Sequence, residues 1–412
     1  MMEVVEVASR EGILVRTPVS VRVTAGEAEV WGAHFDELDL KQEAMDLLIT
    51  AKGNAKLELT KSDYLKIDNP IPEWWDDILD KLIDKLVIFI GRTDSGKSSS
   101  ILYISNKLLS RGERVSLVDC DIGQSDLGPP GVISSVNLEH QVYQIKMLEP
   151  EFMYFLGDKS PRGHLLQMLI GVQEAMRGVR ERTVLVNTTG FVDGAAARTL
   201  KRYKLEALNP DLAVFIERSE GELEHLVRSI PKGLEVIRVR SPVKDTIKDR
   251  NYRSLSRKAS LRKYLCGGFM RTFDIGEVDL ENTFLLTGEE KGEYSSFLSD
   301  VLGSDVVWVE ESPDMLLILT EGHVDRMKSR ELGDLLRKEV RYAPKEVYEN
   351  LYVGLKYNRR CSGVGILRSL DLRGRRAEVL TKYGGQVDAI SLGFIRLTEE
   401  GEELGTREVD SP

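Results

Sequence analysis

Short runs in which apolar and polar residues alternate fill the first 70 residues of the chain, and Gly, Asn and Asp separate them. An alternation with a period of two is typical of half-buried strands. The pattern therefore predicts a small all-β domain over residues 1–70. Its expected strands are 12–16, 19–23, 28–32 and 55–59.

The segment 69–75 (NPIPEWW) contains two prolines and is predicted to be a linker, and helical spacing follows it in DDILDKLIDKL. The interpretation favoured for Trp74 and Trp75 is that they cover an apolar surface. Because they lie just before the next strand, a nucleotide-facing role stays open as the alternative.

From residue 86 the rhythm changes to apolar strand-like runs with helical stretches between them. Such an alternation predicts a parallel sheet with helices on both faces, and hence an α/β domain over residues 71–267. The expected strands are 86–90, 114–119, 183–187, 211–217 and 234–239.

After residue 267 the chain changes character again, which predicts a third, mixed and β-rich domain over residues 268–412. Short strands are expected in TFLLTG, DVVWVE and MLLILT, a charged helix near 325–340, and further strands in the apolar stretches after residue 351. The predicted fold class is thus α/β, with a central P-loop sheet between a small N-terminal β domain and a β-rich C-terminal domain.

The composition is that of an ordinary soluble protein: of 412 residues, 42% are hydrophobic and 30% are charged. No membrane segment or signal peptide is expected from the pattern. The three cysteines lie far apart without a C-x-x-C spacing, which indicates neither a disulfide framework nor a zinc site. A cytoplasmic location is the expectation.

Residues 87–100 read VIFIGRTDSGKSSS and match G-x-x-x-x-G-K-[ST] without a mismatch. The glycines let successive backbone N–H groups curl around a phosphate, and the following helix, expected at 96–109, adds the positive end of its dipole. The stretch predicts an ATP site in which Lys97 reaches the β- and γ-phosphates and Ser98 binds Mg²⁺. The predicted nucleotide-binding residues are Gly91, Thr93, Asp94, Ser95, Gly96, Lys97, Ser98 and Ser99.

A second acidic motif follows the next predicted strand in VSLVDCDIGQ. Residues two apart in a strand point the same way, so Asp119 and Asp121 could both face the phosphate loop. One carboxylate could hold Mg²⁺ through water while the other accepts a proton from an incoming hydroxyl. Gln124, after the turn, could orient water or a phosphate oxygen. The alternative is an ordinary Asp-rich turn.

A third segment, VLVNTTGFVDG, ends a strand in hydroxyl-bearing residues and a glycine. Thr188, Thr189 and Gly190 would offer hydroxyls and a backbone N–H nest at the same edge of the sheet.

The net charge of −10 argues weakly against indiscriminate binding of nucleic acid, but one segment is strongly basic. Residues 237–263 hold ten Lys or Arg and two Asp. Within it, Arg253 and Arg257 lie one helical turn apart and could close over phosphates as a lid. The alternative is a solvated helical face.

Together these motifs resemble the P-loop polynucleotide 5′-hydroxyl kinases, which include the RNA kinase of pre-mRNA and tRNA processing and the nucleolar pre-rRNA kinase. The resemblance is carried by GRTDSGKSS, by DCDIGQ with the downstream PPG, by NTTGF, and by RSLSR followed by LRKYLCG. These four motifs occur in the family's order over about 180 residues.

The resemblance implies a role for each matched position. Lys97 and Ser98 would handle phosphate and Mg²⁺, Asp121 would be the general base and a metal-site acid, Thr188 and Gly190 would belong to a clasp for the RNA end, and Arg253 and Arg257 would form the lid. The family clasp commonly reads T-x-G-W, whereas Phe191 stands here without an indole N–H. The family also uses its N-terminal domain to hold the base, through residues that the pattern does not name.

The sequence therefore predicts an ATP-dependent, Mg²⁺-using kinase that phosphorylates the 5′-hydroxyl of RNA, with DNA as a possible substrate, RNA-processing proteins as possible partners and no membrane. Two alternatives stay open. One is an ATP-binding scaffold of a processing complex without turnover. The other is a different P-loop enzyme, either an ATPase or a small-molecule kinase.

Overall fold

The fold is described from a computed structural model that covers residues 3–43, 45–60, 63–242, 250–324 and 326–408. The chain divides into two compact units, residues 1–260 and 261–412. Residues 243–249 of the basic segment, and the first residue of the charged helix expected near 325–340, lie outside the described residues.

The N-terminal strands form two antiparallel sheets. One sheet has the order β1 (Glu3–Val7), β8 (Ala55–Leu59), β3 (Val19–Ala25), β6 (Glu37–Leu40). The other has the order β5 (Ala33–Phe35), β4 (Ala28–Val30), β7 (Asp46–Ala51), β2 (Glu11–Arg16), β9 (Tyr64–Asp68). Alternate residues point into the core between them, as the period of two predicts.

The central sheet has seven strands in the order β13 (Phe152–Phe155), β12 (Val132–Leu138), β11 (Val115–Cys120), β14 (Thr183–Thr188), β10 (Leu86–Gly91), β15 (Leu212–Glu217), β16 (Glu235–Arg240). The five strands expected from sequence are present and parallel. The expectation of an entirely parallel sheet is wrong at one edge, because β12 runs antiparallel to β11 and β13 antiparallel to β12. The short links between these strands hold no crossover helix, which a parallel pair requires.

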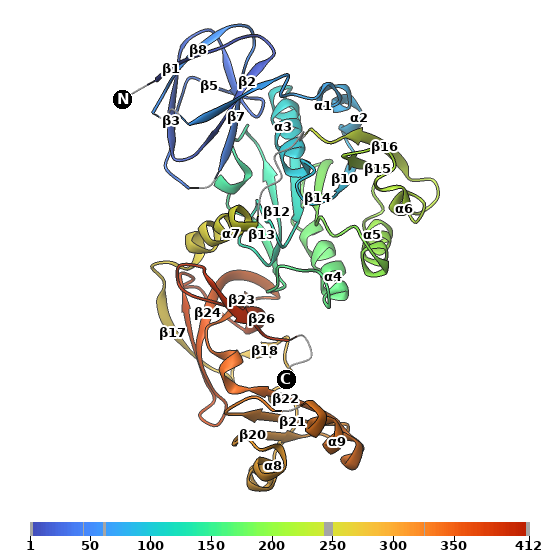
Figure 1. The fold of residues 1–412 in the computed structure, drawn as a ribbon, viewed down its shortest axis with the longest axis vertical. Helices are drawn as coiled ribbons and strands as arrows, with labels where there is room; N and C mark the ends of the chain where they lie inside the picture. Colours follow the sequence, from blue (N-terminus) through green and yellow to red (C-terminus); the bar gives the residue numbers. More distant parts are fainter. Residues whose placement is uncertain (1–2, 44, 61–62, 243–249, 325, 409–412) are drawn as a thin grey trace. The chain divides into compact units, whose positions relative to one another are not determined.

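Helices cover both faces of this sheet (Figure 1). On β10, Val87 and Phe89 belong to the core shared with α3 (Lys97–Ser110), whereas Ile88 and Ile90 belong to the core shared with α4 (Leu165–Met176) and α5 (Ala195–Leu208). The first of these cores continues into the N-terminal sheets. The prediction of a central P-loop sheet with helices on both faces is confirmed. The other helices of this unit are α1 (Glu73–Asp77), α2 (Leu79–Leu82), α6 (Glu224–Val227) and the first part of α7 (Arg250–Leu265).

The predicted linker 69–75 is wrong at its end, because Trp74 and Trp75 lie in α1. The Trp75 ring is buried, packs on Tyr103 at 4.7 Å between ring centroids, and donates its indole N–H to Ser100 Oγ at 2.8 Å. This packing of Trp75 on α3 fits the interpretation of an apolar cover.

The second unit contains two sheets. One has the order β17 (Phe269–Asp274), β25 (Arg376–Thr381), β24 (Arg360–Asp371), β23 (Leu351–Tyr357), β26 (Ala389–Leu397), β18 (Asp279–Glu281), with β27 (Glu403–Thr406) paired to β26. The other has the order β19 (Glu289–Glu290), β20 (Val306–Glu311), β21 (Met315–Thr320), β22 (Glu339–Pro344), and packs with α8 (Ser295–Leu302) and α9 (Arg326–Leu336).

One expectation for this unit is wrong and a second needs a shorter boundary. TFLLTG is a turn between β18 and β19, because Asn282 and Leu286 have φ angles of 60° and 64°, while the neighbouring Leu285 supplies the buried apolar side chain. The charged helix expected near 325–340 is present as α9, but it ends at Leu336, and residues 339–344 form β22. The β-rich character expected for this part of the chain is confirmed.

Candidate active site

The glycine-rich motif forms a tight loop between β10 and α3. Asp94 and Gly96 have φ angles of 58° and 89°, in the left-handed region that favours glycine. A Cβ on Gly91 would lie 2.4 Å from Ser95 Oγ and 3.0 Å from the Ile216 carbonyl oxygen, so a larger residue would force the loop to shift. The Lys97 ammonium lies beneath the loop and donates to the carbonyl oxygens of Gly91 and Arg92 at 3.0 and 2.8 Å.

The Lys97 side chain is buried, and several charged side chains act on its ammonium. Burial lowers the pKa of Lys97, while the nearby carboxylates of Asp121, Asp94 and Asp119 act in the opposite direction. A triphosphate at the loop would bring further negative charge to the same ammonium. The position of the Lys97 ammonium therefore suits binding of a phosphate group at the loop.

Asp119 and Asp121 have different surroundings. Asp119 accepts hydrogen bonds from the backbone N–H groups of Asp121, Asp126 and Leu127 at 2.8–3.1 Å, and from Asn187 Nδ2 at 3.0 Å. Burial, together with the charges of Asp126 and Asp121, raises the pKa of Asp119 to about 7 despite these backbone bonds. With its oxygens engaged in this way, Asp119 shapes the loop that follows β11.

Asp121 lies on the cavity side of that loop. Its Oδ1 accepts the backbone N–H groups of Gly123 and Gln124 at 3.3 Å each. Burial raises the pKa of Asp121, and the positive charges of Lys97 and Lys201 lower it. Two weak hydrogen bonds leave Asp121 with acceptor capacity directed at the cavity, which suits a proton acceptor.

The oxygens near Ser98 fit a magnesium ion. Asn187 Nδ2 contacts Ser98 Oγ at 3.3 Å, and the buried Asn187 Oδ1 has no hydrogen-bond partner among the described residues. Within that described part of the chain, no group of three or more His, Cys, Asp or Glu side chains could hold a metal ion. Mg²⁺ commonly uses one or two protein oxygens together with water and substrate phosphates, so Ser98 and Asp121 suffice as protein contacts.

The predicted clasp lies next to the phosphate loop, but its threonine side chains face inward. Thr188 Oγ1 donates to the Phe89 carbonyl at 2.8 Å, and Thr189 is also buried. Gly190 is pressed against the loop, because a Cβ there would lie 2.3 Å from the Thr93 backbone nitrogen. The groups that this segment can offer to a substrate are therefore backbone groups and not the threonine hydroxyls. The clasp role stays a prediction.

Replacing Gly190 with alanine should weaken ATP binding by about tenfold to a hundredfold. The added methyl group meets the Thr93 backbone, which must shift, and overpacking of this kind costs about 1–3 kcal/mol. Calorimetric titration with MgATP measures the change. Gly53→Ala is the control, because a Cβ there meets nothing within 4 Å. Equal affinities for Gly190→Ala and the unmodified protein would contradict the steric argument.

The predicted lid arginines lie on α7 near the phosphate loop. Arg253 Nη1 is 3.7 Å from Asp94 Oδ2, and Arg257 lines the cavity. The same helix contacts the N-terminal sheets through Tyr252, whose hydroxyl donates to Asp46 Oδ2 at 3.0 Å. The basic segment is thus, where it is described, more than a solvated helical face.

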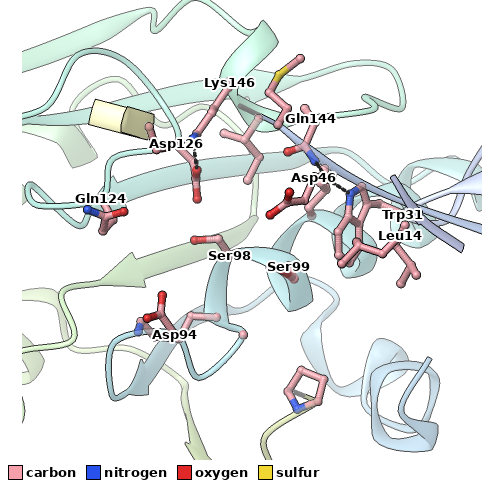
Figure 2. Close-up of a pocket in the computed structure, with 18 of the residues that line it drawn as sticks. Leu14, Trp31, Asp46, Asp94, Ser98, Ser99, Gln124, Asp126, Gln144 and Lys146 are labelled. Carbon is pink, nitrogen blue, oxygen red and sulfur yellow. Dashed lines mark hydrogen bonds and ion pairs between the residues drawn. The ribbon is translucent and has the colours of Figure 1, made fainter. Parts of the chain in front are cut away.

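A cavity of about 460 Å³ brings most of these residues together (Figure 2). One part is polar and is formed by loop residues 93–99 with Asp121, Gln124 and Arg257. The other part is largely apolar and comes from the N-terminal strands and α1. Its lining includes Leu14, Trp31, Met45, Leu48, Leu65, Ile67 and Trp75. Gly91, Asp119, Thr188, Thr189, Gly190 and Arg253 do not line it.

The apolar part of the cavity was missed by the sequence interpretation. Trp31 donates its indole N–H to the Asp46 carbonyl at 3.1 Å, and Gln144 donates to the same carbonyl. Lys146 lies 3.7 Å from Asp126, which Figure 2 marks with a dashed line. These residues come from separate strands and loops without a shared spacing. The sequence held two signals: the general expectation that the N-terminal domain holds the base, and the nucleotide-facing role left open for Trp75, which lines this part of the cavity.

A sheet with five parallel strands, a phosphate loop over a buried lysine, and a carboxylate facing the same cavity define a P-loop phosphotransferase. A family model for the P-loop of the mRNA cleavage and polyadenylation factor CLP1 matches residues 91–267. The polyribonucleotide 5′-hydroxyl-kinase of Pyrococcus horikoshii is 32% identical over 328 residues, covering 77% of this chain and 88% of its own. That of Thermococcus kodakarensis is 34% identical over 330 residues, covering 77% and 90%.

The chain belongs to the polyribonucleotide 5′-hydroxyl-kinase family. One chain of a solved complex of Clp1p with Pcf11p has the same fold, with a TM-score of 0.66 at 12% identity over 96% of this chain and 98% of that one. Within the described residues, no helix is long and apolar enough to cross a membrane.

Proposed function

We propose that this chain transfers the γ-phosphate of ATP to the 5′-hydroxyl of RNA, and that DNA is a second possible acceptor. The observation that carries the proposal is the shared cavity: Lys97 and Ser98 of the phosphate loop line it together with Asp121. A kinase needs its phosphate donor and its proton acceptor at one place, and little covalent chemistry besides.

The apolar part of the cavity suits a nucleotide base. Trp31, Leu14 and Leu48 lie around it, while Asp46 and Gln144 add polar groups at its edge. A base between these side chains would place its triphosphate toward the phosphate loop, whose N–H groups and α3 dipole favour anions.

The RNA acceptor would approach Asp121 from the side opposite to the bound nucleotide. Its 5′-hydroxyl gives a proton to Asp121 as the oxygen forms its bond to the γ-phosphorus and the bond to the leaving ADP oxygen breaks. Lys97 stabilises the charge on the transferring group, and Arg253 and Arg257 close over it from α7. Ser98 and Asp121 would hold Mg²⁺, which would supply neutralisation of phosphate charge when it is bound.

Two other functions remain as alternatives. An ATP-binding scaffold of an RNA-processing complex would use the same cavity without turnover, and the solved Clp1p complex with Pcf11p makes protein partners a reasonable proposal for this chain. A P-loop ATPase or small-molecule kinase would also need Lys97 and Ser98. Asp121 beside the phosphate loop favours a kinase, because a scaffold has no use for a proton acceptor.

Transfer of label from γ-³²P-ATP to a 5′-hydroxyl RNA oligonucleotide with Mg²⁺ tests the proposal. We expect labelled RNA, no label on the same oligonucleotide that already carries a 5′-phosphate, and weaker or equal label on the DNA counterpart. Free phosphate without labelled RNA would indicate the ATPase, and bound ATP without either product would indicate the scaffold.

A further inference from the structure

Helix α5 carries two lysines whose side chains lie inside the protein. Lys201 is 2% exposed and Lys204 is 0% exposed. They are three positions apart and therefore lie on the same face of the helix, which packs against the core of the central sheet. Among the described residues neither ammonium has a carboxylate within 4.0 Å, and a buried charge of this kind is costly. An apolar residue would suit the core better, so a functional reason is needed.

One contact distinguishes the two lysines. Lys201 Nζ donates to the carbonyl oxygen of Thr189 at 2.7 Å, whereas Lys204 Nζ has no hydrogen-bond partner among the described residues. Thr189 directly follows β14, in the short segment that runs from the end of this strand to Asp193. Lys201 thus reaches from α5 to the backbone of the predicted clasp.

This contact fixes the orientation of one peptide unit. The Thr189 carbonyl and the Gly190 N–H belong to the same planar trans peptide, so they point in opposite directions. With the carbonyl directed at α5, the N–H of Gly190 is directed away from α5. The Gly190 Cα lies against Thr93 of the phosphate loop, because a Cβ there would be 2.6 Å from Thr93 Cα.

The side chains of the clasp threonines give no substitute for this backbone donor. Thr188 bonds within the sheet, and the Thr189 hydroxyl is buried without a partner among the described residues. One donor that the segment can present to a substrate is therefore the backbone N–H group of Gly190, whose direction depends on Lys201.

We propose that Lys201 is a positioning residue for phosphoryl transfer: it anchors the Thr189 carbonyl and thereby aims the Gly190 N–H at the 5′ end of the acceptor strand. The inference rests on the proposed kinase function and assigns a task to a residue that lies outside the four motifs. Burial lowers the pKa of Lys201 well below its usual range, with Lys204 and Lys97 acting in the same direction. An amine donates to a carbonyl in either protonation state, so the anchor holds in both.

Three variants test the proposal with the full-length protein. Lys201→Met removes the donor and keeps the length of the side chain. Lys201→Gln removes the charge and keeps an N–H donor. Lys204→Met is the matched control, because it removes a lysine that is equally buried on the same face but lacks the hydrogen bond.

For Lys201→Met we expect the KM for 5′-hydroxyl RNA to rise about tenfold or more and kcat/KM to fall by about tenfold to a hundredfold, while the KM for ATP changes less than about twofold. Lys201→Gln should recover part of the loss, and Lys204→Met should stay within about threefold of the unmodified protein. Thermal melting of each variant shows whether it is folded. A protein merely weakened in its core would lose affinity for both substrates.

Three results would overturn the inference. Lys201→Met could leave the RNA KM unchanged, Lys204→Met could reproduce its effect, or Lys201→Gln could be no better than Lys201→Met when both are folded. If the unmodified protein transfers no label to RNA, the proposed function itself fails and this inference fails with it. An active unmodified protein with an equally active Lys201→Met removes the inference alone.

Discussion

Replacing Lys97 with alanine should lower kcat/KM for phosphoryl transfer by about a thousandfold. Its ammonium lies beneath the phosphate loop, within 3.0 Å of the Gly91 and Arg92 carbonyl oxygens, and is the cation from which a γ-phosphate at this loop would draw stabilisation. Burial makes that cation more effective, because charges interact more strongly away from water. Label transfer from γ-³²P-ATP measures the loss.

Lys85→Ala is the control for Lys97→Ala. Lys85 directly precedes the same strand at its opposite end, where it pairs with Glu235 at 3.1 Å on the surface. We expect its loss to change transfer by less than about twofold, since surface ion pairs contribute little. A Lys97→Ala protein that keeps a tenth or more of the activity would contradict the role given to the phosphate loop.

The central sheet and its loop were predictable because local patterns determine them. The apolar run 86–90, the glycines at 91 and 96 and the helix that follows are contiguous, and each step constrains the next. The antiparallel edge strands were not predictable in the same way. The segments 132–138 (VISSVNL) and 152–155 (FMYF) carry no signal of strand direction, which depends on whether the connection contains a helix.

Sequence motifs predicted the residues of the polar part of the cavity, whereas they did not predict those of its apolar part. Trp31, Asp46 and Gln144 meet only after one of the N-terminal sheets and the loop after β12 have folded together. The inward direction of Thr188 was also hidden, because the sequence does not tell which of two neighbouring threonine side chains bonds inside a sheet. Lys201 was missed for a related reason: a lysine in an amphipathic helix normally predicts an exposed position.

Replacing Asp121 with asparagine should lower kcat by about a thousandfold, because the amide cannot accept the proton of the incoming hydroxyl. The change is nearly isosteric, and the asparagine carbonyl can keep the bonds from the N–H groups of Gly123 and Gln124. ATP binding should therefore fall far less than transfer does. Parallel measurement of ATP affinity and of label transfer separates the two, and an equal loss in both would argue for a role in binding only.

The pH dependence of kcat/KM gives an independent test of the same residue. Burial raises the pKa of Asp121 above the usual range of an aspartate, so the ionised base is lost as the pH falls through this raised value, and activity falls with it. Asp126 is a like charge that contributes to the rise. Asp126→Asn should therefore move the acid limb to lower pH and keep most of the activity at neutral pH.

This opposite response makes Asp126→Asn a matched control, because it removes one carboxylate from the same loop. Asp121→Asn should lose the acid limb together with the activity, whereas Asp126→Asn should only displace it. An acid limb that stays in place in Asp126→Asn, or that survives unchanged in the residual activity of Asp121→Asn, would assign the proton transfer to another group. The two carboxylates are five positions apart in one loop. A general weakening of that loop would affect both variants alike, so it would not produce these two different results.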